Sequence, residues 1–449
     1  MSNPPFDSLS EALAWLDGHI NYEATAPSAR ALPTLAPMVE LAHLLGDPQE
    51  AYPSVHVTGT NGKGSTAAMT TALFGAMGLR VGTYTSPNLS RVNERLALDG
   101  EPIDDASFRA VLSVLAGLEG MLTERPTRFA LLTAAALAWF ADEAVAAGVI
   151  EVGLGGTWDC TNVVDGRVAV LTNVSYDHTD VLGPTLEGIA ADKAGIIKEG
   201  SVAVVGETDP HLVEIVTGRA RRIGAEAWVA GREFDCTANR LAVGGRLLDL
   251  RTPAATYGEI LVSLHGPHQG TNAACALAAA EAFFGAPLDE SLVEEAFSQV
   301  RVPGRLEVVG RQPLTLVDGA HNVAGMSVLA TALSDGFSVA GATVVVVGML
   351  RGRDPSAMLA ALATAGVDLV VACAPESPRA LAPEVVAEAA NALGLRVLTA
   401  PSVADAVATA RGAVPDDGLL VVAGSLYVVA EARRLLLEEK AAGSALPPG

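Results

Sequence analysis

The chain has 449 residues, a formal net charge of −22, and a composition that is 50% hydrophobic and 4% aromatic. Since this length exceeds what one ordinary hydrophobic core holds, we expect two or three domains. The acidic balance argues against nonspecific binding to nucleic acid or to an anionic membrane. An anionic ligand would therefore need a local basic site.

The four cysteines, Cys160, Cys236, Cys275 and Cys373, are far apart and form no CxxC pair. This spacing is typical of neither a disulfide framework nor a zinc site. The first residues lack a basic region followed by an apolar core, and the longest apolar runs fall short of the ~20 residues that span a bilayer. We expect a cytoplasmic protein without a membrane role.

Strand and helix patterns alternate along the first part of the chain. We expect an opening helix at 9–20 and a longer helix at 130–147, and runs rich in β-branched residues predict strands at 54–57, 80–85, 149–152, 168–174 and 202–205. This alternation predicts a doubly wound parallel sheet. The stretch 228–264, with its Gly244-Gly245 pair, predicts a small antiparallel appendage.

The alternation restarts in the last third of the chain. A helical run at 271–284 precedes Val302-Pro303-Gly304, where we expect a hinge, and strands follow near 314–317, 343–347, 368–372, 396–399 and 419–423. We therefore predict a first domain over 1–301 and a second α/β domain over 302–449.

A glycine-rich turn follows the first predicted strand, in the sequence VHVTGTNGKGST at 55–66. Its glycines let the backbone N–H groups face an anion, Lys63 adds a positive charge, and a helix expected from about residue 67 offers its positive end. Ser65 and Thr66 can reach a magnesium ion. The standard P-loop has four residues between its first glycine and its Gly-Lys pair. Here only Thr60 and Asn61 lie between Gly59 and the Gly-Lys pair, so the sequence predicts a variant phosphate loop. The alternative is a glycine-rich turn with an incidental lysine.

Polar residues also follow the other predicted strands of this sheet, at the edge where open parallel sheets bind ligands. Ser86 follows the second strand, Glu151 ends the third, and His178 comes after the fourth. A carboxylate in a buried strand needs a cation, so Glu151 either pairs with a core arginine or binds magnesium. His178 is either a loop-capping residue or a metal ligand.

Further candidates lie later in the chain. Lys193 is at an apolar helix start, where a snorkelling surface lysine is the alternative to a site residue. Asp318 and His321 follow the first strand of the second domain and suit contacts to a ribose or a nucleophile, although Asp318 is alternatively a helix N-cap. Arg305, near the hinge, can neutralise phosphate.

Nine segments, taken in order, resemble the folylpolyglutamate synthase and dihydrofolate synthase branch of the Mur ligases. They are HVTGTNGKGST (56–66), TSPNLSRVNER (85–95), EVGLGGTWDCTN (151–162), YDHTDVLGPT (176–185), IAADKAGIIKEG (189–200), HGPHQGTNAACAL (265–277), VPGRLE (302–307), DGAHN (318–322) and GSLY (424–427).

The resemblance implies a Mur-ligase-like α/β fold, with a P-loop-containing ATP-binding domain over 1–301 and a Rossmann-like glutamate ligase domain over 302–449. It implies ATP-dependent amide bond formation with Mg²⁺. A folate or pteroate carboxylate takes the γ-phosphoryl group, becomes an acyl phosphate, and is attacked by the amine of L-glutamate.

The same resemblance assigns roles to residues. It implies catalytic roles for Lys63, His178 and Lys193, and it implies carbamylation of Lys193, which would make that residue an anionic metal ligand. The implied metal ligands are Ser86, Glu151 and His178. The implied nucleotide contacts are Thr60, Asn61, Gly62, Lys63, Gly64, Ser65, Thr66, Asn272, Arg305, Asp318 and His321. The implied substrate contacts are Phe129, Ala130, Trp158, Asp159, Cys160 and Ser425.

Departures from the family pattern fall where the acceptor binds. The family usually has Glu at Ala130, His at Asn88, Arg at Thr157, and Asp-Lys-Asp near Arg353-Asp354. Dihydropteroate, tetrahydrofolate polyglutamates or both are therefore open as acceptors. The alternatives are a Mur-type amide ligase with a non-folate acceptor and an ATP-binding paralogue without ligase activity. We expect a monomer without nucleic-acid partners.

Overall fold

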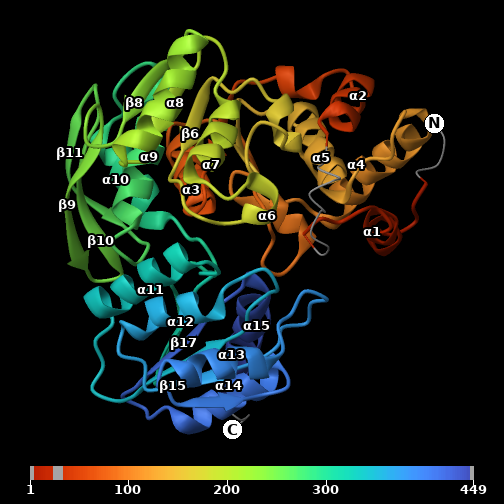
Figure 1. Ribbon diagram of the computed structural model, residues 1–449. Coiled ribbons are helices and arrows are strands. Elements are labelled where there is room, and N and C mark those ends of the chain that lie inside the picture. Colours follow the sequence, from red (N-terminus) through yellow and green to blue (C-terminus); the bar gives the residue numbers. More distant parts are fainter. Residues whose placement is uncertain (1–4, 24–33, 445–449) are drawn as a thin grey trace, which may run out of the picture. The chain divides into compact units, whose positions relative to one another are not determined.

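The computed structural model describes residues 5–23 and 34–444, which form two compact units. The first unit contains most of the chain up to Val300, and the second contains the chain from Arg301 onward. Two short segments, Arg240–Arg246 and Ser263–Gln269, group with the second unit. Figure 1 shows the elements of both units, each of which is described by itself below.

The first unit is built on an eight-stranded sheet with the order β4-β3-β2-β5-β1-β6-β7-β8. Six of these strands are parallel, and β3 and β4 form an antiparallel edge. The strands are β1 (Ser54–Thr58), β2 (Val81–Tyr84), β3 (Leu96–Leu98), β4 (Glu101–Pro102), β5 (Ala147–Glu151), β6 (Val168–Leu171), β7 (Val202–Val205) and β8 (Glu226–Val229).

Helices connect these strands, and a separate three-stranded antiparallel sheet follows them. The helices are α1 (Leu9–Asp17), α2 (Ala36–Leu44), α3 (Lys63–Ala76), α4 (Asp105–Leu118), α5 (Arg128–Asp142), α6 (Thr179–Leu182), α7 (Leu186–Lys193), α8 (Pro210–Arg222), α9 (Gln269–Phe284) and α10 (Glu290–Gln299). The small sheet has the order β11-β10-β9 and consists of β9 (Asp235–Ala242), β10 (Gly245–Arg251) and β11 (Thr256–Val262).

The five parallel strands predicted for this sheet are present, and some boundaries differ. Ala144 has a left-handed backbone (φ 50°) and the Val145 N–H bonds back to the Phe140 carbonyl, so α5 ends at Asp142 rather than at 147. Trp228 belongs to β8, which pairs in parallel with β7. The antiparallel appendage therefore begins at Asp235 and not at 228.

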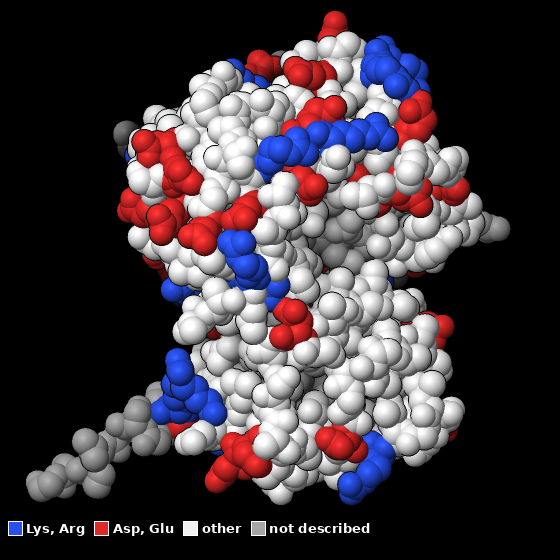
Figure 2. Space-filling model, turned by 90° about the vertical axis from the view of Figure 1, so that its left-hand side faces the viewer, with Lys and Arg blue, Asp and Glu red and all other residues white. Residues whose placement is uncertain are grey.

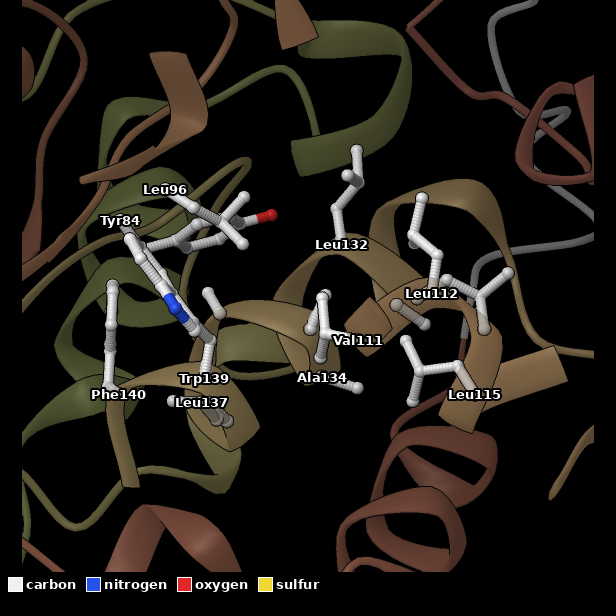
Figure 3. Packing of buried hydrophobic residues seen from close by; sticks show 14 of the residues in the cluster. Tyr84, Leu96, Val111, Leu112, Leu115, Leu132, Ala134, Leu137, Trp139 and Phe140 are labelled. Atoms are coloured by element: carbon white, nitrogen blue, oxygen red, sulfur yellow. The ribbon is translucent and has the colours of Figure 1, made fainter. Parts of the chain in front are cut away.

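Both faces of the large sheet are buried at its centre, because all five residues of β5 are buried while alternate side chains point to opposite faces. Figure 3 shows part of one cluster, to which Tyr84 of β2, Leu112 of α4 and Phe140 of α5 all belong. Elsewhere Phe74 of α3 stacks on Phe283 of α9, with the ring centroids 4.6 Å apart.

The second unit is built on a six-stranded sheet with the order β12-β13-β17-β14-β15-β16, of which only β12 is antiparallel. Strand β12 was not predicted. The elements are β12 (Glu307–Arg311), β13 (Leu314–Val317), α11 (Val323–Gly336), β14 (Thr343–Val347), α12 (Pro355–Ala363), β15 (Leu369–Ala372), α13 (Pro383–Ala392), β16 (Val397–Thr399), α14 (Val403–Ala413), β17 (Leu419–Ala423) and α15 (Leu426–Ser444).

Three further observations concern the surface charges, the cysteines and the helices. On the face shown in Figure 2, basic side chains form separate groups interspersed with acidic ones. All four cysteines are free thiols. Within 5–23 and 34–444, no helix has both the length and the apolar character needed to cross a membrane.

Candidate nucleotide and metal site

The glycine-rich turn lies between β1 and α3, as predicted, and α3 begins at Lys63 rather than near 67. Gly59 (φ 147°) and Gly62 (φ 84°) have backbone conformations that side chains disfavour. A Cβ at Gly62 would lie 2.5 Å from the Asn272 Oδ1 atom, and one at Gly59 would overlap the Thr172 hydroxyl. The turn therefore requires glycine at both positions, and Asn272 of α9 lies directly against it.

The first half of this phosphate loop, residues 59–61, is bonded to the segment that follows β6. The Thr60 N–H donates to the Asn173 carbonyl at 3.0 Å, and the Asn61 N–H donates to Asn173 Oδ1 at 3.0 Å. These two N–H groups already have acceptors. The helix α3 begins directly after these residues, and the first N–H groups of a helix point beyond its N-terminus, which is an arrangement that binds anions.

Two lysine ammonium groups converge on the loop. Lys63 Nζ donates to the Gly59 and Thr60 carbonyls at 3.0 and 3.3 Å, and Lys193 Nζ donates to the same Gly59 carbonyl at 3.0 Å. Lys193 is the last residue of α7 and only 3% exposed, so it is neither at a helix start nor on the surface.

Burial, and to a lesser extent the nearby Lys63 charge, lower the pKa of Lys193 to about 7, although Asp192 and Asp159 act in the opposite direction. A large fraction of Lys193 is therefore a neutral amine near pH 7.

Glu151, the last residue of β5, is 4% exposed and lies beside the loop. Its Oε2 atom accepts a hydrogen bond from the Ser86 N–H at 3.0 Å, and a Cβ at Gly64 would be 3.7 Å from the same oxygen. The structure thus brings together the ends of β2 and β5 and the start of α3. The predicted proximity of Glu151 and Ser86 to the loop is present.

His178 is at the N-cap of α6 with a left-handed backbone (φ 49°). Its N–H donates to Asp177 Oδ1 at 2.8 Å, and its Nε2 atom lies 3.6 Å from the same oxygen. The chain just before it is attached to the loop, because the Ser175 N–H donates to Thr60 Oγ1 at 3.0 Å and that hydroxyl donates to the Ser175 carbonyl at 3.2 Å. His178 thus lies three residues after Ser175, which is hydrogen-bonded to the loop.

The donor set fits a magnesium ion better than a transition metal. No group of three or more His, Cys, Asp or Glu side chains suited to a metal occurs in the described part of the chain. Magnesium bound with a nucleotide needs only one or two protein carboxylates, and phosphates and water complete its shell. Glu151 and Ser86 carry hard oxygen atoms of the kind that magnesium prefers, and Glu151 lies beside the loop. The Thr66 hydroxyl, in the first turn of α3, is buried without a hydrogen-bond partner among the described residues.

The residues expected to line the acceptor site fall into two groups. Phe129 and Trp158 are partly exposed, and the Phe129 ring lies so close to Gly153 that a Cβ there would be 2.5 Å from the ring. Ala130 and Cys160 are buried in the hydrophobic cluster around α5. The Asp159 carboxylate accepts hydrogen bonds from the Leu154 N–H, the Thr161 N–H and the Thr161 hydroxyl at 2.6 to 2.9 Å.

Buried Asp159 holds its own loop in place through these bonds, and burial raises the pKa of its carboxyl. Of the predicted acceptor contacts in the first unit, Phe129 and Trp158 therefore offer accessible side chains.

In the second unit, Asp318 follows β13 and accepts hydrogen bonds from the Leu306 and Ala320 N–H groups, both at 2.8 Å. It is not a helix N-cap, because Asn322 caps α11 by accepting from the Gly325 N–H at 2.7 Å. The Arg305 guanidinium lies against Gly319, where a Cβ would overlap it.

Two further predicted residues lie in the same unit. His321 Nδ1 is 2.8 Å from the Gly319 carbonyl. Ser425, 2% exposed, accepts a bond from the Val428 N–H at 3.3 Å at the start of α15. Ser425 comes two residues after the end of β17, the strand that pairs with β13.

Sequence reasoning missed three residues that shape the site: Thr172, Asn173 and Gly153. Thr172 and Asn173 directly follow β6, and a polar pair after a strand of this sheet was a usable signal. Gly153 follows β5 by two residues, and nothing in the local sequence indicates that a ring packs on it.

The chain is similar to known proteins over most of its length. The Mur ligase middle domain matches residues 57–280, and the Mur ligase, glutamate ligase domain matches residues 304–426. A dihydrofolate synthase/folylpolyglutamate synthase of Mycobacterium tuberculosis is 39% identical over 445 residues, covering 91% of both chains.

Solved structures are also similar. The Mycobacterium tuberculosis folylpolyglutamate synthase complexed with ADP is 37% identical with a TM-score of 0.90, and the match covers 98% of this chain and 99% of that one. A bifunctional folylpolyglutamate synthase/dihydrofolate synthase with Mn, AMPPNP and L-glutamate bound is 28% identical with a TM-score of 0.84, covering 97% of this chain and all of that one. The chain belongs to the folylpolyglutamate synthase and dihydrofolate synthase family of the Mur ligases.

Proposed function

We propose that this chain is an ATP-dependent ligase that adds L-glutamate to a folate-type carboxylate and releases ADP and phosphate. The observation that carries the proposal is the convergence of Lys63, Glu151 and Ser86 on one glycine-rich loop at the strand ends. Relatives with this fold carry the names of both dihydrofolate and folylpolyglutamate synthases. The acceptor is thus dihydropteroate, a tetrahydrofolate polyglutamate, or both.

The reaction has two steps. A carboxylate oxygen of the acceptor attacks the γ-phosphorus of ATP, the bond to the β-phosphate oxygen breaks, and ADP leaves. The glutamate amine then attacks the carbonyl carbon of the acyl phosphate, loses a proton, and expels inorganic phosphate. Because the reactants are anions, the site has to hold them in line and neutralise their charge.

In this proposal the loop residues Thr60 to Thr66 hold the β- and γ-phosphates, and Lys63 supplies a cation to the developing charge. Lys63 Nζ already lies at the loop, where it donates to two backbone carbonyls. In this proposal a change of its side-chain conformation brings the ammonium group to the phosphates. Ser86, Glu151 and His178 would hold Mg²⁺. That ion would supply charge neutralisation for the triphosphate and the acceptor carboxylate.

Lys193 is the proposed site of carbamylation. Carbamate formation consumes a neutral amine and CO₂ and releases a proton. The lowered pKa of Lys193 keeps that neutral form populated near pH 7. The product would be an anion near the Lys63 cation, so carbamylation would add an electrostatic attraction beside the loop.

The remaining assignments concern the nucleoside and the second substrate. Asn272, Arg305, Asp318 and His321 are proposed to contact the nucleotide, and Phe129, Trp158 and Ser425 to contact substrates. We assign the ATP-binding domain to 1–301 and the glutamate ligase domain to 302–449. We also propose a cytoplasmic monomer that acts without nucleic acid or a membrane.

The experiment is ADP release by the purified protein, with Mg²⁺ and ATP, against dihydropteroate, tetrahydrofolate and tetrahydrofolate diglutamate, each with and without L-glutamate. The proposal predicts ADP release that requires both glutamate and at least one of these acceptors. Activity with none of them would instead favour a non-folate acceptor. Tight ATP binding without turnover on any acceptor would favour an ATP-binding protein without ligase activity.

A further inference from the structure

A short segment after β6, residues 172–175, is joined to the phosphate loop by several hydrogen bonds. The Asn61 carbonyl accepts two hydrogen bonds from it, one from Thr172 Oγ1 at 2.6 Å and one from Asn173 Nδ2 at 2.8 Å. The Asn61 N–H donates to Asn173 Oδ1 at 3.0 Å. The side chain of Asn173 thus bonds both backbone polar groups of one loop residue.

These bonds fix the loop at its least regular point. Asn61 lies between Gly59 and Gly62, both of which have positive φ, so its neighbours have more backbone freedom than other residues. Thr172 is 2% exposed and also lies under Gly59, where it fills the space that a Cβ would occupy. The segment that directly follows β6 therefore holds the loop in its conformation, through a hydrogen bond between residues 111 positions apart in sequence.

The same segment continues to the candidate metal site. Ser175 exchanges two hydrogen bonds with Thr60, and His178 follows three residues later. A shift of the loop against this segment would therefore move the phosphate-binding groups relative to His178. Correct spacing between these two parts matters because phosphoryl transfer depends on alignment within a fraction of an ångström.

We propose that Thr172 and Asn173 are positioning residues that hold the phosphate loop in its binding conformation before a nucleotide arrives. They contact the loop backbone and no reacting atom. The inference rests on the proposed function only in taking the ligand to be a nucleoside diphosphate or triphosphate. It adds two residues for which the family resemblance assigned no role.

The expected effect follows from the hydrogen bonds. Removing the Thr172 hydroxyl leaves the partly buried Asn61 carbonyl with one of its two observed donors, and the freed loop then has to be ordered at the expense of nucleotide binding. Losing such a bond typically costs a factor of about 5 to 100 in an equilibrium constant. We expect ADP affinity to fall about tenfold in Thr172→Val, which keeps the shape of the side chain, and in Asn173→Ala.

The test is calorimetric titration of the full chain with ADP and Mg²⁺, together with thermal unfolding of the ligand-free protein. Thr172→Ser restores the hydroxyl and should bind ADP within about twofold of the wild type. Matched controls remove an exposed hydroxyl in α11 (Thr331→Val) and an exposed amide in α13 (Asn391→Ala), and both should bind ADP normally. Hydrogen exchange of the Asn61 N–H in ligand-free protein gives a second measurement and should be faster in Asn173→Ala.

Three results decide the proposal. Weaker ADP binding in both variants, with rescue by Thr172→Ser and a well-folded protein, supports it. Unchanged ADP affinity in both variants, or equal losses in Thr172→Ser and Thr172→Val, overturns it. If Thr172→Val unfolds, faster exchange at Asn61 in Asn173→Ala supports the proposal and unchanged exchange overturns it. Because ADP binding needs no acceptor, a failure of the folate assignment would leave this result intact.

Turnover gives a readout that a purely structural role would not move. Among the folded variants, the KM for ATP should rise while the KM for the acceptor stays constant. A loss of folded protein would instead lower kcat and leave both KM values unchanged.

Discussion

Adding one methyl group at Gly153 tests whether Phe129 lies on the acceptor path. Gly153 follows β5, and a Cβ at this position would lie 2.5, 3.0 and 3.0 Å from three atoms of the Phe129 ring. Carbon atoms in contact are normally 3.5 to 4.0 Å apart, so in Gly153→Ala the ring has to retreat by about 1 Å.

The cost of such overpacking is about 1 to 3 kcal/mol, which corresponds to a factor of roughly 5 to 150. Part of this cost lowers the free energy of unfolding, and part weakens the binding of any ligand that needs the ring in place. We expect the KM for the acceptor to rise about tenfold, whereas ADP affinity should change less than twofold because the loop contacts of Gly62 and Gly64 are untouched.

The assay is steady-state ADP release with the acceptor varied at saturating ATP and glutamate, paired with an ADP titration. Gly117→Ala is the matched control, because Gly117 lies in α4 and a Cβ there meets nothing within 4 Å. An unchanged acceptor KM in Gly153→Ala would refute the role of Phe129. A loss of ADP affinity as large as the rise in acceptor KM would also refute it, since the perturbation would then not be specific to the acceptor.

Three other outcomes are expected. Lys63→Ala should lower kcat by two or more orders of magnitude with little change in the acceptor KM, and near-normal turnover would contradict its role. Glu151→Gln should raise the Mg²⁺ concentration needed for half-maximal turnover at least tenfold, because one hard anionic ligand is lost, and an unchanged Mg²⁺ titration would exclude it as a ligand. Burial raises the pKa of Glu281, which is 1% exposed and accepts a bond from the Tyr257 hydroxyl at 2.5 Å. The protonated carboxyl stabilises the folded protein, and this stabilisation is fully present below pH 4.5 and is lost as the pH rises through the raised pKa. Urea unfolding from pH 4.5 to 8 should therefore show a decline in the free energy of unfolding that Glu281→Gln lacks. Equal pH slopes in the two proteins would contradict this reading.

The parts of the fold that were predictable depend on local sequence. Buried parallel strands are short runs of β-branched residues, so β1, β5, β6 and β7 were found near their observed positions. Strands β3 and β4 have three and two residues, and runs of that length carry too little periodicity to detect. Trp228 was misplaced because a parallel edge strand and an antiparallel strand have the same local pattern.

The site was predictable where its residues follow strands and less so where they meet by tertiary packing. The glycine-lysine turn, Ser86 and Glu151 were identified because strand ends share one edge of the sheet. Burial of Lys193 depends on the chain that folds over it, so the local pattern left a surface lysine and a site residue as alternatives. The pairing of Asn173 with Asn61 spans 112 residues, and no local signal predicts it.

The central claim is that the acceptor carboxylate is phosphorylated by ATP before the amide bond forms. It is tested most directly by supplying an acceptor whose carboxylate carries ¹⁸O, together with ATP, Mg²⁺ and L-glutamate, and by analysing the inorganic phosphate by mass spectrometry. We expect one ¹⁸O atom in each phosphate released, because the carboxylate oxygen that attacks phosphorus leaves as part of the inorganic phosphate. Unlabelled phosphate, formed at the same rate as the amide product, would contradict the account.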